Sequence, residues 1–181
     1  MRLFVGVLLP DEVKNEIFEI QKKIGNKNAK INWVYKKNLH LTLKWLGEVE
    51  ENKLNIIGNC LENVKFKIIK AKIGKLSNFE HLGKIRVLWI GFEPKDEIID
   101  LQKKIDASLL EIFRGDQRFN PHLTLGRVKL IKKLKEFKED YKNTEINKLE
   151  FTISEFCLIS SRLTKDGPIY KTMKRFKSQN L

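Results

Sequence analysis

The sequence contains the tetrapeptide His-Leu-Thr-Leu twice, at His40–Leu43 and again 82 positions later at His122–Leu125. The apolar run Arg2–Pro10 has a similar counterpart in Arg86–Pro94, which lies 84 positions further along the chain. Landmarks that recur in the same order at nearly the same spacing are typical of a duplicated unit. We therefore predict two copies of a unit of about 80 residues. The copies cover about residues 1–80 and 81–176.

Each copy has the pattern of a strand, a helix and a further strand. Short apolar runs closed by proline predict buried strands, and apolar residues at helical spacing predict amphipathic helices. In both copies the first predicted helix ends in the sequence Gln-Lys-Lys-Ile. The predicted strands are 3–9, 39–46, 66–73, 87–92, 122–128, 151–163 and 169–176. The predicted helices are 12–24, 54–64, 95–105 and 131–141. Strands outnumber helices and do not alternate regularly with them, so we predict an α+β fold with mainly antiparallel sheets.

The charge of the chain points to a polyanionic partner. Lys and Arg number 36 against 23 Asp and Glu, which gives a formal net charge of +13. Such an excess favours binding to nucleic acid, and the alternative interpretation is a solvated basic surface. Most residues of the basic clusters, such as 132–135 and 171–177, are expected to be solvated and to attract RNA only in a general way.

The length and the cysteines restrict the class of protein. A chain of 181 residues has room for one domain or two small lobes. The two cysteines, Cys60 and Cys157, exclude a disulfide framework and a cysteine-rich zinc site. The apolar start at 3–9 is too short to span a membrane and is not a secretion leader. We predict a reduced, cytoplasmic protein without a membrane partner.

The repeated tetrapeptide predicts an acid–base site. Side chains alternate across a strand, so His40 and Thr42 share one face while the leucines between them point into a core. The same holds for His122 and Thr124. Two imidazoles in one cavity can divide the work of proton transfer, and the threonine hydroxyls and the Arg127 guanidinium can bind phosphate oxygens. This set of groups fits phosphodiester hydrolysis without a metal ion.

Other interpretations of these residues are less specific. A single histidine on a strand is usually a polar surface residue, and two histidines are compatible with zinc, but no further ligand lies at a familiar spacing. His81 has no counterpart in the repeat and is expected in a loop over 78–83. Phe79, in the same segment, is expected in the core, and the alternative is that its ring stacks on a base. Asn26–Asn28 and Gly115–Gln117 are also predicted loops.

The motifs and their flanks resemble the 2H phosphoesterases, and within them the RNA 2′,3′-cyclic phosphodiesterases, also described as RNA 2′-5′ ligases. That family carries two His-x-Thr-x motifs about 80 residues apart. The matching flanks are Trp33-Val34, Asn38-Leu39, Trp45-Leu46-Gly47, Phe119-Asn120-Pro121, Gly126-Arg127, 158–163 and 167–170. The resemblance implies a single bilobal α+β domain over 1–181, with two antiparallel sheets facing a central groove, helices outside, and terminal strands that cross between the lobes.

The resemblance also implies an activity. The substrate is RNA with a 2′,3′-cyclic phosphate end, which is hydrolysed to a 2′-phosphate, with His40 as proton donor and His122 as proton acceptor. Neither a cofactor nor an obligate protein partner is implied, and ligation to a 2′-5′ linkage is a by-product of the same site. Two alternatives stay open: a non-catalytic RNA-binding module of the same fold, and a 2H enzyme that acts on a small cyclic nucleotide.

Overall fold

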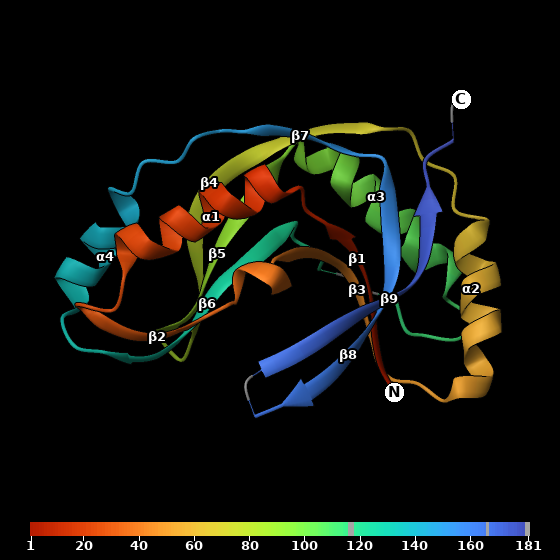
Figure 1. Cartoon of the computed structure of the whole chain (residues 1–181), viewed down its shortest axis with the longest axis horizontal. Helices are drawn as coiled ribbons and strands as arrows, with labels where there is room; N and C mark the ends of the chain where they lie inside the picture. Colours follow the sequence, from red (N-terminus) through yellow and green to blue (C-terminus); the bar gives the residue numbers. More distant parts are fainter. Residues whose placement is uncertain (116–117, 166, 180–181) are drawn as a thin grey trace.

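The computed structural model describes residues 1–115, 118–165 and 167–179, in which helices and strands alternate irregularly (Figure 1). The strands are β1 (Arg2–Leu8), β2 (Ala29–Trp33), β3 (His40–Glu48), β4 (Ile69–His81), β5 (Lys84–Glu93), β6 (His122–Ile131), β7 (Glu150–Ile153), β8 (Glu155–Thr164) and β9 (Gly167–Lys177). The helices are α1 (Asp11–Ile24), α2 (Leu54–Glu62), α3 (Lys95–Ser108) and α4 (Leu134–Lys142), with short 3₁₀ turns η1 (Lys36–Asn38) and η2 (Glu51–Lys53). None of the helices in these ranges is long and apolar enough to cross a membrane.

The strands form two sheets in which every neighbouring pair is antiparallel. One sheet has the order β3-β1-β8-β9 and the other has the order β2-β6-β5-β4-β7. Helices α1 and α4 lie on the second sheet, and α2 and α3 lie beside the first (Figure 1). This arrangement confirms the predicted α+β class, with two antiparallel sheets and the helices outside.

The two repeated units exchange strands. Strand β4 follows α2 in the first unit but pairs with β5 of the second unit, from Lys72↔Glu93 to His81↔Lys84. In return, β8 of the second unit pairs with β1 of the first, from Arg2↔Ser161 to Gly6↔Cys157. Each sheet therefore contains strands from both units.

The helices form for the reasons that their sequences predict. In α1, Val13, Ile17, Ile20 and Ile24 recur at helical spacing, and each has 4% or less of its surface exposed. Acidic residues occupy the first turn of α1 and lysines the last, which suits the helix dipole. The side-chain amide of Gln21 donates hydrogen bonds to the carbonyls of Val34 (2.9 Å) and Leu125 (2.8 Å), which ties α1 to the edge of the second sheet.

Several predicted boundaries are wrong. The single strand expected over 151–163 is two strands, β7 and β8, which separate at Ser154 and belong to different sheets. Strand β2 was not predicted, because it is short and only half apolar. Residues 66–68 lie outside β4, and the region around Ile131 ends β6 rather than starting a helix.

Two predicted loops have different outcomes. His81 is the last residue of β4, directly before a tight turn in which Leu82 and Gly83 have positive φ angles of 50° and 68°. The loop expected over 78–83 is therefore wrong for residues 78–81, which belong to β4, and is confirmed only for the turn at Leu82 and Gly83. Of the loop predicted at Gly115–Gln117, Gly115 is irregular, and residues 116 and 117 lie outside the described ranges.

Candidate active site

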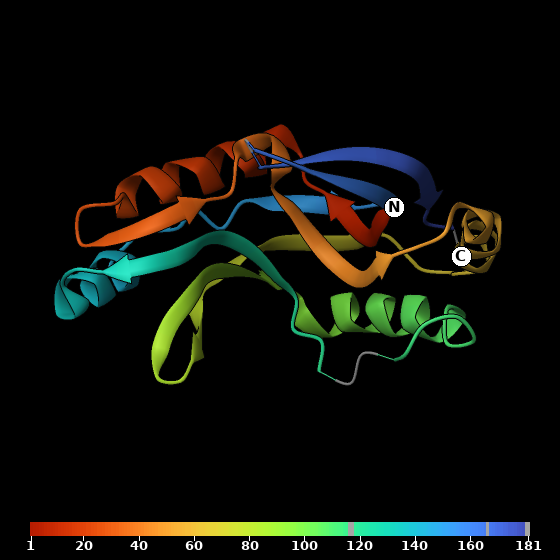
Figure 2. The same cartoon turned by 90° about the horizontal axis from the view of Figure 1, so that it is seen from below.

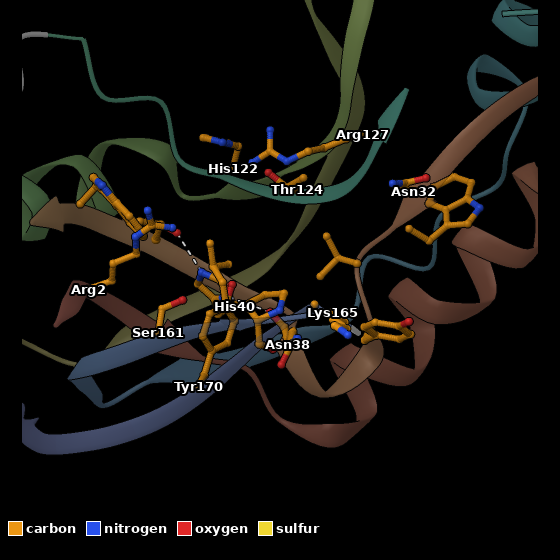
Figure 3. Close-up of a pocket in the computed structure, with 18 residues that line it drawn as sticks. Arg2, Asn32, Asn38, His40, His122, Thr124, Arg127, Ser161, Lys165 and Tyr170 are labelled. Atoms are coloured by element: carbon orange, nitrogen blue, oxygen red, sulfur yellow. Dashed lines mark hydrogen bonds between the residues drawn. The ribbon is translucent and has the colours of Figure 1, made fainter. Parts of the chain in front are cut away.

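The two His-Leu-Thr-Leu motifs start strands β3 and β6, and their side chains meet at one cavity. The leucines Leu41, Leu43, Leu123 and Leu125 are each 1% exposed or less, whereas the histidines and threonines are half-buried, so the predicted alternation is confirmed. The cavity has a volume of about 930 Å³. It is lined by the predicted residues His40, Thr42, His122, Thr124 and Arg127, and also by Arg2, Asn32–Tyr35, Asn38, Trp45, Ser161, Leu163, Lys165, Gly167, Pro168 and Tyr170 (Figure 3).

The cavity has two walls, one from each motif strand. In Figure 3, His122, Thr124 and Arg127 project from β6 on one side, and His40 lies with Tyr170 on the other side. The charge of Arg127 acts on the Tyr170 hydroxyl, and the charge of His122 acts on His40, so the two walls influence each other electrostatically.

A β-bulge in each motif strand decides which later side chain faces the cavity. In β3 the register steps from Gly6↔Thr42 to Val5↔Lys44, so that strand carries one extra residue. The side chain of Lys44 is thereby turned away and is only 2% exposed, with its ammonium donating to Asp106 and to the Arg114 carbonyl (2.9 Å). Trp45, which is 56% exposed, takes the place at the cavity.

The matching bulge in β6 brings Arg127 to the cavity. The register steps from Trp89↔Thr124 to Leu88↔Gly126, so simple alternation from Thr124 would have put Gly126 on the cavity side instead of Arg127. Gly126 is required here, because a Cβ atom at this position would lie 2.8 Å from Cε3 of Trp33 and 2.6 Å from Cγ2 of Ile31. The bulge and the glycine together aim the guanidinium beside Thr124 (Figure 3).

Backbone carbonyls hold both imidazole rings in the same way. Nδ1 of His40 lies 2.7 Å from the carbonyl oxygen of Asn38, and Nδ1 of His122 lies 2.7 Å from that of Asn120. A carbonyl oxygen can only accept, so Nδ1 is the donor in both rings and Nε2 is the nitrogen that gains and loses a proton. Nε2 of neutral His40 accepts a hydrogen bond from the hydroxyl of Thr42, at 3.0 Å.

Aromatic side chains pack against each histidine, and one of them comes from the other unit in each case. His40 contacts Phe4 and Tyr170, with ring centroids 4.7 and 5.1 Å apart, and Tyr170 belongs to β9 of the second unit. His122 contacts Phe79 of the first unit at 4.9 Å. Phe79 is 37% exposed, so the expectation that it lies in the core is wrong.

The environment of His40 favours its neutral form. Burial lowers the pKa of His40, the hydrogen bond to Asn38 partly opposes this, and the positive charge of His122 lowers the pKa further. Burial raises the pKa of Tyr170, and the nearby Arg127 acts in the opposite direction. Tyr170 therefore remains a neutral hydroxyl that can donate a hydrogen bond at physiological pH.

Some cavity residues were not predicted as site residues. Arg2 lies at the rim and its Nε donates to Oε1 of Glu48 at 2.7 Å. Trp45 sits 82 positions before Arg127, the same spacing as the histidines, and this periodicity is the signal that could have identified it. Tyr170 lies on β9, which pairs with the exchanged strand β8, and the apolar pattern of the sequence does not specify this pairing. His81 does not line this cavity.

No group of three His, Cys, Asp or Glu side chains in the described ranges could hold a metal ion.

Comparison with known proteins identifies similar chains over the full length. The model of the LigT-like phosphoesterase family matches twice, over residues 7–89 and 90–170, which follows the internal repeat. The chain is 38% identical to a Methanocaldococcus jannaschii protein named RNA 2′,3′-cyclic phosphodiesterase, over 97% of this chain and all of that protein. It is 32% identical to a Thermotoga maritima protein of the same name, over 96% and 93% of the two chains.

Solved structures have the same fold. The crystal structure of TT0787 from Thermus thermophilus superposes with a TM-score of 0.79 at 26% identity, over 98% of this chain and 97% of that chain. E. coli LigT complexed with phosphate superposes with a TM-score of 0.76 at 24% identity, over 99% and 98% of the two chains.

Proposed function

The chain belongs to the LigT-like phosphoesterase family, and from this premise we propose that it hydrolyses the 2′,3′-cyclic phosphate ends of RNA to 2′-phosphates. The names of the relatives from M. jannaschii and T. maritima support this substrate. The net charge of +13 supports a polyanionic substrate in preference to a small cyclic nucleotide.

The observation that carries the proposal is the shared orientation of the two imidazoles. Each ring is held through Nδ1 by a carbonyl two residues before it, so each presents Nε2 for proton transfer at the same cavity. A base and an acid on opposite sides of one phosphate are what in-line opening of a cyclic phosphodiester requires.

In the proposed reaction, His122 acts as the base and His40 as the acid. Nε2 of neutral His122 takes a proton from water while the water oxygen attacks phosphorus. The bond between phosphorus and the 3′ oxygen breaks, and Nε2–H of protonated His40 gives its proton to that oxygen. The products are a 2′-phosphomonoester and a 3′-hydroxyl, and one proton has moved from His40 to His122 overall.

The charge that develops on the non-bridging phosphate oxygens needs donors. The hydroxyls of Thr42 and Thr124 line the cavity beside the histidines, and Arg127 offers a planar fork of N–H groups. Fixed donors of this kind stabilise a transition state because they need little reorganisation as the charge develops. If a 5′-hydroxyl of RNA replaces water as the nucleophile, the same steps form a 2′-5′ linkage.

The decisive experiment is turnover of an RNA with a 2′,3′-cyclic phosphate end in the presence of EDTA, with the product phosphate identified by ³¹P NMR. We expect a 2′-phosphate, with turnover unaffected by EDTA. A 3′-phosphate product would overturn the proposed function, because the bond that breaks would then be the one from phosphorus to the 2′ oxygen. Turnover of 2′,3′-cyclic mononucleotides without turnover of the RNA would instead assign the site to small cyclic nucleotides.

A further inference from the structure

A second basic cavity lies where strands β5 and β6 separate. The two strands are paired only from Val87↔Arg127 to Gly91↔His122, although β5 begins at Lys84 and β6 continues to Ile131. Figure 2 shows the hairpin of β4 and β5, in yellow-green, curving away from the end of β6. The space between the two strand ends, which we call the wedge, is a cavity of about 430 Å³.

The wedge is strongly positive. Its lining includes the cations Lys84, Arg86, Lys129, Lys132 and Lys138 and the single acidic residue Glu80. Four of the cations are exposed and Lys138 is half-buried, and none of the five takes part in an ion pair within the part of the chain that the structure describes. Unneutralised cations that converge on one cavity attract an anionic ligand.

The strand edges that face the wedge also have free backbone groups. Along this stretch β5 pairs with β4 on its other edge, and β6 pairs with β2 on its other edge, from Ile31↔Val128 to Ala29↔Ile131. No strand of the described ranges adds to the edges in between. The backbone N–H groups there supplement the lysine side chains as donors to an anion.

The wedge lies further along the strand that forms one wall of the active-site cavity. Arg127 lines the first cavity and Lys129, two residues further along β6, lines the wedge. A second bulge in β6 lies between them, where the register steps from Ile31↔Val128 to Lys30↔Leu130. Lys129 is roughly 20 Å from His122 along the strand. That is a path of a few nucleotides, and the RNA chain must leave the active site on the 5′ side of its cyclic end.

We propose that the wedge is a second phosphate-binding site, which holds the RNA backbone a few nucleotides upstream of the cyclic end. This inference rests on the proposed function for its substrate. Charge complementarity and the position of both cavities along strand β6 favour an RNA strand over an acidic protein surface. The half-exposed apolar side chains of Leu130 and Leu134 lie beside the cations and suit contact with riboses or bases.

The test compares two triple variants with the same change of charge. Lys84→Gln, Lys129→Gln and Lys132→Gln together remove three cations from the wedge. The control variant carries Lys53→Gln, Lys65→Gln and Lys67→Gln, which are exposed and line neither cavity. Each protein is assayed with a dinucleotide and with a longer single-stranded RNA, both ending in a 2′,3′-cyclic phosphate.

For the wedge variant we expect KM for the longer RNA to rise about tenfold, because three phosphate contacts are lost. The slope of log KM against log salt should fall by about 2, because each phosphate contact to single-stranded RNA contributes about 0.7 to that slope. Turnover of the dinucleotide and all parameters of the control should stay as in the unmodified protein. An equal rise of KM in both triple variants would overturn the proposal, because the effect would then come from the net charge of the protein and not from the wedge. Unchanged kinetics with the longer RNA would also overturn it and leave another anion, such as an acidic protein, as the ligand.

Binding of an RNA with an ordinary 3′-hydroxyl, measured by fluorescence anisotropy, separates this inference from the proposed function. If the unmodified protein does not hydrolyse even the dinucleotide, the proposed function fails. Weaker binding of the longer RNA by the wedge variant alone would still support the wedge, and equal binding by all three proteins would overturn it.

Discussion

Trp45 and Arg127 occupy equivalent positions in the two halves of the chain, 82 residues apart, each brought to the cavity by a bulge just after a His-x-Thr motif. The tetrapeptides before these two residues are identical, so this pair is a main source of asymmetry between the two walls. One wall has an exposed aromatic ring, and the other has a cation that can bind a phosphate oxygen with two N–H groups.

Arg127→Ala should lower kcat/KM for RNA with a cyclic end by about 100-fold, the usual effect of removing one strong donor from a developing oxyanion. Arg127→Lys should recover only part of the loss, because an ammonium keeps the charge but not the planar fork. Steady-state kinetics with the dinucleotide substrate will measure both. Full activity in Arg127→Ala would remove this residue from charge stabilisation.

His40→Ala and His122→Ala should each abolish most of the activity, and the double variant should be little worse than either one, because groups that act as a unit are not additive. Thr42→Val and Thr124→Val should cost less, about tenfold each, since each removes one hydrogen bond. The matched control is His81→Ala, because His81 lies at the end of β4 and does not line the cavity. Near-normal turnover in either motif variant would contradict the two-histidine mechanism.

The pH dependence of kcat/KM should be bell-shaped, and its two limbs belong to the coupled pair of histidines. Burial lowers the pKa of His40, so the free protein loses its acid form below the usual value of about 6.5. A bound cyclic phosphate is negative and favours the protonated ring, so kcat should persist to a higher pH than kcat/KM. Profiles of kcat and kcat/KM with coincident basic limbs would contradict this assignment.

The two histidines should also be coupled in the absence of substrate. The charge of His122 lowers the pKa of His40, so His122→Gln should raise the pKa of His40 towards its usual value. Titration of the ring protons by NMR measures this directly, and His81 in the same spectrum is the internal reference. No upward change at His40 would mean that the two rings do not interact electrostatically.

Gly126→Ala should destabilise the protein by about 1–3 kcal/mol, because its Cβ atom would clash with Ile31 and Trp33 and force β2 away from β6. Gly58→Ala is the control. Gly58 lies inside helix α2, and a Cβ atom there meets only the flexible side chain of Lys174, at 3.6 Å. That change should be neutral or stabilising by up to about 1 kcal/mol. Urea unfolding of both variants measures the free energy of unfolding. Equal values for the two variants would show that β2 can move away from β6 without a cost in stability.

The sequence was sufficient to predict the fold class and which motif side chains face the cavity. These features depend on local patterns: the alternation of His40 and Thr42 with buried leucines holds over one strand and needs no knowledge of its neighbours. The bulges that present Trp45 and Arg127 depend on how β3 and β6 align with β1 and β5, which local alternation does not encode.

The exchange of strands between the two units could not be predicted from local patterns either, because it also depends on which strands pair. The apolar run at 151–163 looks continuous, yet at Ser154 it passes from one sheet to the other, because its partners, β4 for β7 and β1 for β8, lie in different sheets. Tyr170 reaches His40, and Phe79 reaches His122, only as a result of these long-range pairings. The family resemblance implied that terminal strands cross between the lobes. The periodicity of the sequence did not specify which strands cross or which side chains they bring to the cavity.

The exchange of β4 and β8 also limits what half of this chain could do by itself. A fragment ending near His81 would contain β1 without β8 and β4 without β5, so its unpaired strand edges would be open to pairing with a second copy of the same fragment. Such a homodimer would obey two-fold symmetry, and its two histidines would have identical surroundings. Joining two copies in one polypeptide lifts that symmetry, so that the residues around each ring can diverge and two chemically identical imidazoles can acquire different proton affinities.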